Sequence, residues 1–338
     1  MSVPAGGFRA IAVLRLSSLG DIVLTLPVVD ALHRAWPEAR VTYWTFEEFG
    51  DLVRFDPAIA HVRQMERDGR RLEDLVSMSA ELEDADLIVD LHGNARTRLL
   101  TFRQRAPVLR SPSYRLRRSA WVHARWARPQ PPPPAHARFA RVLDSLGLKP
   151  DGPPRVHAGV DAERWAAEAR AADPGPPGLA LLPGARHETK RWPEEHWLDL
   201  HERLRGRCHR LIYFSLESER NAMPALAQRV AADSAARWCT EPLPRMAALL
   251  SDCQAAVSCD SGLMHLAAAR GLRVVAMFGS TAPELGFAPA GTGHAVLCRH
   301  EPCQPCTLHG RAACPKRHFR CMVEIRPAEV AARLEGLL

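Results

Sequence analysis

A short polar turn near the start of the chain places a carboxylate where it could act as a base. The segment Arg15–Asp21 reads RLSSLGD and follows an apolar run typical of a buried strand. Gly20 permits a tight turn, and free N–H groups at the start of the next helix favour an anion. Asp21 could accept a proton there from an attacking hydroxyl group. It could equally cap the helix, which by itself is the more frequent role of such an aspartate.

Further turns in the second half of the chain could bind a phosphate. One (LLPGA) is followed by a basic pair that could neutralise a phosphate charge. Another (CDSGLMH) starts an expected helix, where the N–H groups and the helix dipole favour a diphosphate. A third, FGST, is rich in hydroxyl groups. Each could instead be an ordinary surface loop or helix cap, and the histidine could be a core residue. The candidate phosphate-side residues are Gly184, Lys190, Asp260, Ser261, Gly262 and His265.

Five of the nine cysteines are crowded between Cys298 and Cys321. A Cys-x-x-Cys pair followed by two more cysteines fits a tetrahedral site for structural zinc or iron. Three nearby histidines, His300, His309 and His318, are alternative ligands, and a set of packed, reduced thiols is the other interpretation. The expected ligands are Cys303, Cys306, Cys314 and Cys321.

A basic segment runs from Leu91 to Leu143 without any Asp or Glu, and it carries twelve arginines. Arginine favours bidentate contacts with phosphate or carboxylate groups. The segment therefore predicts an anionic partner, although a solvated basic face is an equal alternative. No nucleic-acid-binding motif accompanies the charge and aromatic residues there are sparse, so a nucleic-acid partner is not expected.

These motifs need two sheets to position them. A chain of 338 residues usually forms more than one domain. Short apolar runs alternate with helical patterns in both halves, which predicts parallel sheets covered by helices. The pattern breaks in the Pro- and Gly-rich stretch 150–177, which also holds an expected linker helix, and Pro327 begins an expected closing helix. The expected strands include 10–16, 40–46, 59–65, 86–91, 179–182, 211–215, 255–258 and 274–278.

The composition favours a cytoplasmic protein. No apolar run approaches the roughly 20 residues of a membrane-spanning helix, and the start of the chain lacks the pattern of a signal peptide. An odd number of cysteines in such a chain makes a disulfide framework unexpected.

The order of the motifs resembles the ADP-heptose–lipopolysaccharide heptosyltransferase family, glycosyltransferase family 9. The resemblance covers nearly the whole chain, through RLSSLGDIVLTLPVVDAL, DLHGNARTRLL, LLPGARHETKRWPEEHW, CDSGLMHLAA, FGSTAPE and the cysteine-rich tail. It implies an α/β protein of GT-B fold, with two doubly wound Rossmann-like domains facing a central cleft and a C-terminal helix closing the chain. The expected parts are an acceptor-binding domain at 1–155, a linker with a helix at 156–177, and a nucleotide-sugar-binding domain at 178–338 that includes the Cys-rich loop 298–321.

The resemblance also implies an inverting transfer of a heptose or similar sugar from an ADP-sugar to a lipopolysaccharide core hydroxyl. Asp21 would be the general base, and catalysis would need neither metal nor cofactor. The sequence departs from the family pattern at Cys259, commonly Asn, and at Ser280, commonly Pro. Donor-binding residues would be Gly184, Lys190, Glu219 (with Glu217 as the alternative register), Asp260, Ser261, Gly262 and His265. Acceptor-binding residues would be Ser18, Gly20, Arg96, Arg98, Arg117 and Arg118.

The expected partners are an ADP-sugar, a lipid-linked glycan and the anionic face of the inner membrane, where the enzyme would be peripheral. Alternatives of the same fold would use a protein or another glycan as acceptor, or would epimerise a nucleotide sugar without any acceptor. An inactive sugar-binding relative is disfavoured, because Asp21, Lys190 and Asp260 are all present.

Overall fold

The structure is a computed structural model that describes residues 6–67, 72–124 and 128–338. Arg125, one of the twelve arginines of the basic segment, lies outside these residues. The described chain divides by its internal contacts into two compact units. One consists of residues up to Ser113 together with Ala135–His157, and the other of Tyr114–Pro134 together with Ala158–Leu338.

The first unit contains a five-stranded, fully parallel sheet in the order β3-β2-β1-β4-β5. Its central strand, β1, has four successive buried residues from Ile11 to Leu14, as expected for a strand covered on both faces. Leu14 lies opposite Trp44 on one side and Asp90 on the other. The strands are β1 (Ala10–Leu14), β2 (Arg40–Phe46), β3 (His61–Met65), β4 (Leu87–Asp90) and β5 (Val108–Arg110).

Helix α1 (Leu19–Ala35) begins directly after the turn that follows β1, and eleven of its seventeen residues are buried. This helix therefore fixes the turn Arg15–Ser18 against the sheet edge where the parallel strands end. The other helices of the unit are η1 (Glu47–Phe49), α2 (Gly50–Val53), α3 (Leu72–Glu81), α4 (Ala95–Leu100), α6 (Ala135–Ala140) and η3 (Arg141–Leu146).

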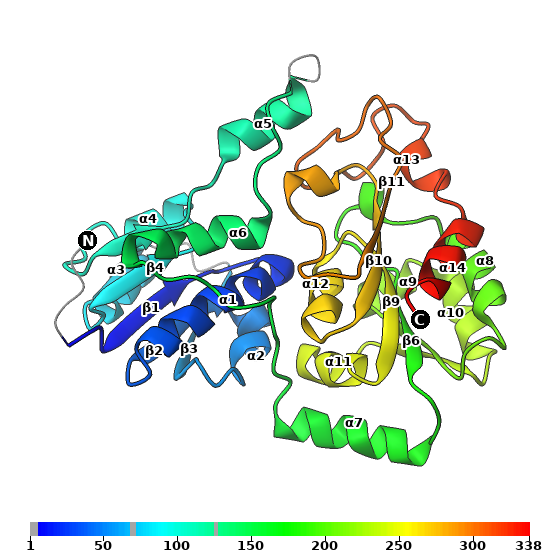
Figure 1. Cartoon of the computed structure of the whole chain (residues 1–338), viewed down its shortest axis with the longest axis horizontal. Helices are drawn as coiled ribbons and strands as arrows, with labels where there is room; N and C mark the ends of the chain where they lie inside the picture. The colour runs from blue at the N-terminus through cyan, green and yellow to red at the C-terminus, as the bar shows by residue number, and fades with distance from the viewer. Residues whose placement is uncertain (1–5, 68–71, 125–127) are drawn as a thin grey trace. The chain divides into compact units, whose positions relative to one another are not determined.

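The second unit contains a six-stranded parallel sheet in the order β11-β10-β9-β6-β7-β8. Helices α12 and α14 both contact β9 and β10, so these strands are covered on both faces (Figure 1). The strands are β6 (Gly178–Leu182), β7 (Leu211–Phe214), β8 (Ala236–Cys239), β9 (Cys253–Cys259), β10 (Arg273–Phe278) and β11 (Ala295–Cys298). The helices are α5 (Arg115–His123), α7 (Val160–Ala172), η4 (Glu188–Lys190), α8 (Glu194–Leu204), α9 (Glu217–Asn221), α10 (Pro224–Ala231), α11 (Leu243–Leu250), α12 (Gly262–Ala269), η5 (Pro283–Leu285), α13 (Arg320–Val323) and α14 (Pro327–Glu335).

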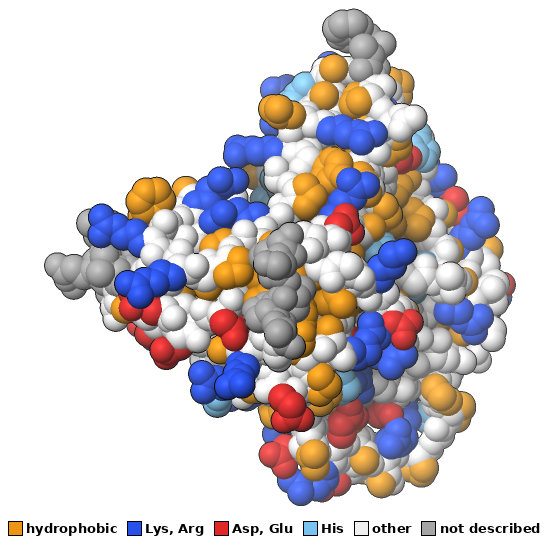
Figure 2. Space-filling view, turned by 60° about the vertical axis from the view of Figure 1, so that its left-hand side comes forward, with side chains coloured by type: hydrophobic (Ala, Val, Ile, Leu, Met, Phe, Trp, Pro, Cys, Tyr) orange, Lys and Arg blue, Asp and Glu red, His pale blue; other side chains and the backbone are white. Residues whose placement is uncertain are grey.

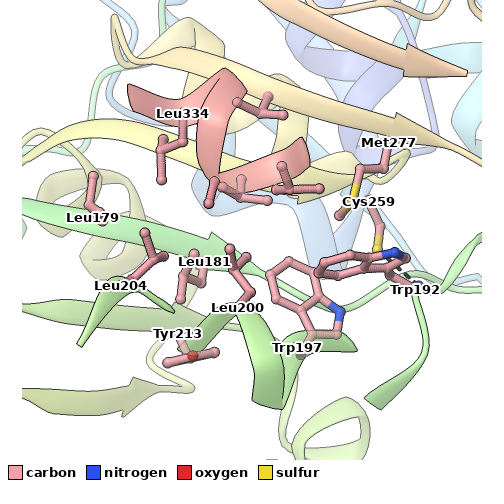
Figure 3. Packing of buried hydrophobic residues seen from close by; sticks show 14 of the residues in the cluster. Leu179, Leu181, Trp192, Trp197, Leu200, Leu204, Tyr213, Cys259, Met277 and Leu334 are labelled. Atoms are coloured by element: carbon pink, nitrogen blue, oxygen red, sulfur yellow. Dashed lines mark hydrogen bonds between the residues drawn. The ribbon is translucent and has the colours of Figure 1, made fainter. Parts of the chain in front are cut away.

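Two tryptophans anchor the core of the second unit (Figure 3). The rings of Trp192 and Trp197 meet edge to face, with centroids 5.1 Å apart. The indole N–H of Trp192 donates to the carbonyl of Ile325 at 3.0 Å, which ties the loop before α8 to the segment before α14. Trp192 is therefore a core residue.

The segment Tyr114–Pro134 differs from the expected organisation. The boundaries expected from composition place it in the N-terminal domain, but its contacts assign it to the second unit. Trp121 and Val122 of α5 pack with Leu285 in a small apolar cluster. Arg118 lies over the ring of Phe287, with its guanidinium carbon 5.1 Å from the ring centroid. Long-range packing of this kind leaves no periodic signal in the local sequence.

Candidate active site

The turn after β1 brings Arg15, Ser18 and Asp21 together. The Arg15 guanidinium Nη2 lies 2.7 Å from Oδ2 of Asp21. The Ser18 hydroxyl donates to the same oxygen at 3.0 Å, and the Ser18 backbone N–H donates to it at 3.4 Å. Asp21 thus completes the capping box of α1, whose N-cap residue is Ser18, in agreement with the helix-capping role that the sequence allows. The ion pair with Arg15 adds a contact that capping does not require, and the side chain of Asp21 remains 19% exposed.

His92 follows β4, the strand next to β1, and its ring lies in the same neighbourhood. The pKa of His92 is lowered to about 4, first by burial and then by the positive charge of Arg15. Arg15 also donates from Nη1 to the carbonyl of Leu91 at 2.7 Å. His92 is therefore a neutral imidazole near pH 7. The sequence predicted no role for it, although its place directly after a strand adjacent to β1 was a usable signal.

Asp90 explains how the chain turns at the end of β4. Its carboxylate accepts the backbone N–H groups of His92 at 3.1 Å and Gly93 at 2.8 Å. The residue is fully buried, and its second oxygen lies 3.4 Å from Nε of Arg110 on the neighbouring strand β5. Asp90 is thus a structural residue that holds the turn carrying His92.

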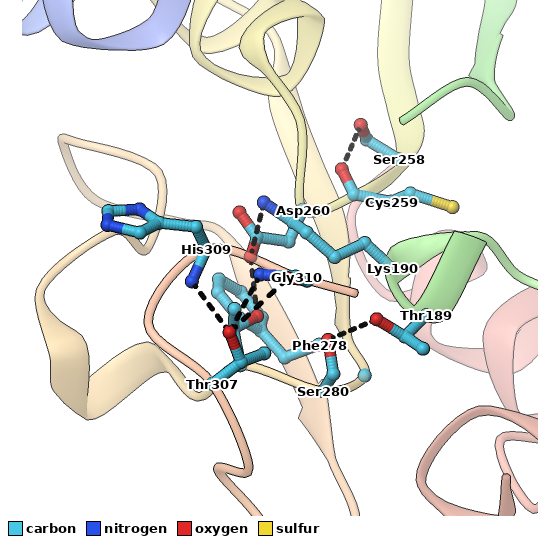
Figure 4. Close-up of polar contacts among 12 residues, drawn as sticks. Thr189, Lys190, Ser258, Cys259, Asp260, Phe278, Ser280, Thr307, His309 and Gly310 are labelled. Carbon is cyan, nitrogen blue, oxygen red and sulfur yellow. Dashed lines mark hydrogen bonds and ion pairs between the residues drawn. The ribbon is translucent and has the colours of Figure 1, made fainter. Parts of the chain in front are cut away.

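A second polar group lies where three neighbouring strands of the other unit end (Figure 4). Lys190, which follows β6, places its ammonium 2.9 Å from Oδ2 of Asp260, which follows β9. Thr281, which follows β10, donates its hydroxyl to the same oxygen at 2.6 Å. Asp260 is only 5% exposed, so its charge depends on these two partners. The structure therefore brings the predicted Lys190 and Asp260 together and adds Thr281.

Helix α12 starts immediately after this aspartate. Ser261 is its N-cap residue and its side chain makes no capping hydrogen bond, and Gly262 is the first helical residue. The N–H groups of the first turn therefore give this edge a positive end of a helix dipole. His265, one turn further on, is 5% exposed, as the core interpretation predicted.

Gly184 and Glu219 meet in a close contact. A Cβ atom on Gly184 would overlap the Glu219 carboxylate, so any larger residue at position 184 would force that carboxylate to move. Glu219 is buried and accepts the backbone N–H of Leu216 at 3.0 Å, and its pKa is raised mainly by burial. Glu217, the alternative register, is exposed and lies 3.4 Å from Arg220. Of the two glutamates, Glu219 is the one beside the Gly184 turn.

Cys259 contacts the backbone of the loop that carries Lys190. The side chain is fully buried, and its sulfur accepts the N–H of Trp192 at 3.4 Å and approaches the carbonyl of Pro183 at 3.6 Å. Burial raises the pKa of this thiol to about 12. The departure from the family's asparagine therefore lies inside the protein, between the two ends of the 183–192 loop.

The four predicted ligand cysteines line one small cavity of about 10 Å³, together with His318. The sulfur of Cys303 lies 3.7 Å from Nε2 of His318. Ligand atoms of Glu301, Cys303 and His318 all lie within 4.8 Å of one another, and among the described residues Cys303 is the one predicted ligand in this group. Burial raises the pKa of Cys321 to about 12, and the neighbouring thiols add to this shift. All nine cysteines are free thiols.

Gln304, within the Cys-rich loop, binds the turn that follows β10. Its Nε2 donates to the carbonyls of Phe278 at 3.1 Å, Gly279 at 2.6 Å and Thr281 at 3.0 Å. The side chain is 4% exposed. The loop is thereby tied to the residue that supports Asp260, a link that sequence reasoning missed because it joins residues by tertiary contact alone.

A second link from the Cys-rich loop reaches the segment that carries Lys190. The backbone N–H of Arg311 donates to the Thr189 hydroxyl at 2.8 Å, and that hydroxyl donates to Ser280 Oγ at 2.8 Å. The close-up in Figure 4 shows Thr189 and Ser280 beside Lys190 and Asp260. The Cys-rich loop therefore supports both turns that hold the lysine–aspartate pair.

The six predicted acceptor-binding residues are divided between the two units. Four of them belong to the first unit: Arg96 and Arg98 lie on α4, and Ser18 and Gly20 lie at the start of α1. Arg117 and Arg118 lie on α5, which its contacts group with the second unit, whereas the expected boundaries place them in the N-terminal domain. Arg117 donates from Nε to the carbonyl of Gln130 at 2.7 Å.

Two α/β units with parallel sheets, each with charged turns at the carboxyl ends of its strands, are typical of the GT-B fold. The family model described as Glycosyltransferase family 9 (heptosyltransferase) matches residues 77–315. The chain belongs to this family, and it is thereby a glycosyltransferase.

Relatives extend the match over nearly the whole chain. The chain is 31% identical to lipopolysaccharide heptosyltransferase 1 of Pseudomonas aeruginosa, over 97% of this chain and 98% of that protein. The crystal structure of the glycosyl transferase family 9 from Veillonella parvula shares its fold with a TM-score of 0.79 and 19% identity, over 97% of each chain. The structure of E. coli heptosyltransferase WaaC with ADP matches with a TM-score of 0.68 and 18% identity, over 97% of this chain and 100% of that one. The predicted fold class is confirmed. No helix among the described residues is both long and apolar enough to cross a membrane.

Proposed function

We propose that the protein transfers a heptose from an ADP-heptose to a hydroxyl group of a lipopolysaccharide core acceptor, with inversion at the anomeric carbon. The observation that carries the proposal is the Lys190–Asp260–Thr281 group at three adjacent strand ends, in a chain of the heptosyltransferase family. The name of the Pseudomonas relative supports a heptose as the sugar and lipopolysaccharide as the acceptor. The E. coli structure with ADP supports the nucleotide.

In this proposal the second unit binds the donor. Lys190 and the N-terminus of α12 would neutralise the diphosphate, which makes a catalytic metal unnecessary. Lys190 already lies against Asp260, so a diphosphate would share the ammonium with this carboxylate. Gly184 and Glu219 would bind the nucleoside side, where their close packing leaves no room for a larger residue at 184.

The first unit would bind the acceptor, and Asp21 would remove the proton from its hydroxyl group as the bond to the sugar forms. Arg15 holds the Asp21 carboxylate at 2.7 Å and so fixes its direction. Neutral His92 adds no positive charge that would compete for that carboxylate. Ser18, Gly20, Arg96 and Arg98 would bind around it, and the boundaries of the two functional domains near residues 155 and 178 remain part of the proposal.

Asp21→Asn tests the base directly. The substitution keeps the size of the side chain but removes most of its basicity, so kcat should fall by about 100- to 10,000-fold. ADP-heptose binding, measured by calorimetry, should stay within about twofold. Asp51, an exposed aspartate that forms an ion pair with Arg54, provides a matched control. Asp51→Asn should retain full turnover. Wild-type turnover by Asp21→Asn would overturn the assignment of the base.

The acceptor requirement separates transfer from the alternatives. Release of ADP from ADP-heptose should depend on added Kdo-substituted lipid A. Conversion of the donor without any acceptor would favour an epimerase, and activity only with a protein or another glycan would keep the fold-based assignment but replace the acceptor.

We further propose a structural zinc or iron ion held by Cys303, Cys306, Cys314 and Cys321, with His318 as the nearest additional ligand. The support is the cavity that these side chains line together. Metal analysis of untagged protein should find about one ion per chain. Cys303→Ser should lose it. Cys208→Ser, which changes a thiol in the loop between α8 and β7, should keep it. A wild-type protein that contains no metal and is nevertheless as stable as the same protein loaded with metal would refute the site.

The chain is also proposed to work in the cytoplasm, at the anionic face of the inner membrane where lipid-linked acceptors are assembled. The arginine-rich, acid-free segment Leu91–Leu143 supports this location.

A further inference from the structure

Helix α4 and the turn after it display two large apolar side chains on the surface of the first unit. Phe102 is 78% exposed and Leu99 is 48% exposed. The backbone N–H of Phe102 donates to the carbonyl of Leu99 at 3.2 Å, so the two residues lie one helical turn apart on the same side. An exposed phenylalanine in water is unfavourable, and two adjacent apolar side chains suggest a contact surface.

Three arginines lie close to these two residues in the sequence. Arg98, Arg103 and Arg105 are all exposed, and none of them makes an ion pair within the part of the chain that the structure describes. The acid-free segment Leu91–Leu143 supplies no carboxylate nearby in sequence. In Figure 2, orange apolar and blue basic side chains border one another on the visible face. We call Arg98, Leu99, Phe102, Arg103 and Arg105 the α4 surface.

The opposite side of the same turn is firmly attached to the unit. Leu100 and Thr101 are buried, and the Thr101 hydroxyl accepts from Arg110 at 2.6 Å. Gln104 donates to the carbonyl of Ser79 at 2.6 Å. The turn is therefore held in place from within, and Leu99 and Phe102 cannot fold inward without breaking these contacts.

We propose that the α4 surface docks the protein on an anionic lipid bilayer. Apolar side chains beside arginines match the boundary between acyl chains and acidic headgroups, since the rings enter the apolar layer while the guanidinium groups pair with phosphates. The combination distinguishes a bilayer from a soluble polyanion, because a polyanion would use the arginines and leave Phe102 in water. This inference names the surface for the membrane location proposed above, and its test needs no transfer activity.

The test is binding of the full chain to vesicles, measured by flotation. Vesicles of phosphatidylcholine alone are compared with vesicles containing 30% (about one lipid in three) phosphatidylglycerol. Wild-type protein should bind the anionic vesicles at least about tenfold more tightly, and the difference should shrink as salt screens the arginines. Equal binding to both, or none to either, would overturn the proposal.

Two variants separate the two kinds of side chain. Leu99→Ser/Phe102→Ser should lower the vesicle partition coefficient about tenfold or more at any salt concentration. Arg103→Gln/Arg105→Gln, which leaves the proposed acceptor-binding Arg98 in place, should lower it by a similar factor only at low salt. The control is Val160→Ser, which removes an apolar side chain that is 80% exposed on α7 beside Asp161, and it should bind as wild type.

The substituted residues lie on the surface, so the variants should keep the wild-type fold. Unchanged circular dichroism and unchanged ADP binding verify this. If the arginine variant loses binding and the serine variant does not, a soluble polyanion is the partner and the bilayer proposal is wrong. Loss of vesicle binding with full ADP release from a detergent-dispersed acceptor leaves the proposed transfer intact. Vesicle binding without any ADP release would refute the proposed transfer and leave the docking surface supported.

Discussion

Asp260 depends on two hydrogen-bonding partners, and each can be removed without changing the shape of the site. Thr281→Val deletes the 2.6 Å hydrogen bond to the carboxylate and keeps the branched side chain. A hydrogen bond to a charged group contributes about 1.5–3 kcal/mol, so the KM for the ADP-sugar should rise about tenfold or more while kcat changes less. Steady-state kinetics measures both. Thr240→Val, at an exposed position, is the control, and an equal effect from it would contradict the role of Thr281.

Gln304 is a positioning residue that acts through Thr281. Gln304→Glu replaces an N–H₂ donor by a carboxylate oxygen against three carbonyl groups, so it should repel the turn after β10. We expect the KM for the donor to rise several-fold and the melting temperature to fall, because a buried charge without partners costs several kcal/mol. Gln254→Glu, an exposed site on β9, should change neither. An unchanged donor KM in Gln304→Glu would refute the link between the Cys-rich loop and the donor turns.

At the scale of elements, the contact between the turn that carries Gly184 and the turn that carries Glu219 restricts which residue position 184 can hold. Gly184→Ala places a methyl group against the Glu219 carboxylate, and the clash should destabilise the chain by about 1–3 kcal/mol. Chemical unfolding measures the loss. Gly6→Ala, where a Cβ meets nothing within 4 Å, is the matched control. The double variant Gly184→Ala/Glu219→Ala should recover part of the stability, and no recovery would place the strain elsewhere.

Most elements could be predicted from the sequence because their signals are local. The expected strand 40–46 is β2, and the expected closing helix at Pro327 is α14. The turns carrying Asp21, Lys190 and Asp260 were found because each follows an apolar run. The assignment of α5 to the second unit could not be found, because it depends on Trp121 packing with Leu285, far away in the chain. Gln304 was missed for the same reason, since one buried amide has no periodic pattern.

At the scale of the whole molecule, buried histidines set the response to acid. The pKa of His92 is lowered to about 4, and the pKa values of His201 and His294 are lowered as well, with burial as the largest cause in each case. The unfolded chain therefore binds more protons than the folded chain once the pH falls below about 6.5. The free energy of unfolding should be fully developed above that pH and should decrease as the pH falls towards 4.

Urea unfolding between pH 7.5 and pH 5.5 measures this decrease. Carboxylates with raised pKa, such as Asp30 and Asp56, work in the opposite direction as the pH falls through their folded-state pKa values, so the measurement is kept near the pH range in which the histidines of the unfolded chain titrate. His92→Gln should flatten the pH dependence, since one of the proton-binding groups of the unfolded chain is gone. A stability that is constant over this window in the wild type would show that the histidines are not held neutral by the fold.

The cysteines divide by accessibility into two populations, and this division makes the chain its own chemical reporter. Cys239, Cys253, Cys259 and Cys321 are buried thiols, whereas Cys208, Cys298, Cys303, Cys306 and Cys314 are partly exposed. In metal-free protein, a thiol-reactive dye should therefore count the accessible group first and the buried group only on unfolding. Four of the five accessible thiols belong to the Cys-rich loop. The rate at which they react would follow the opening of that loop in real time, in the unmodified protein and without an added label site.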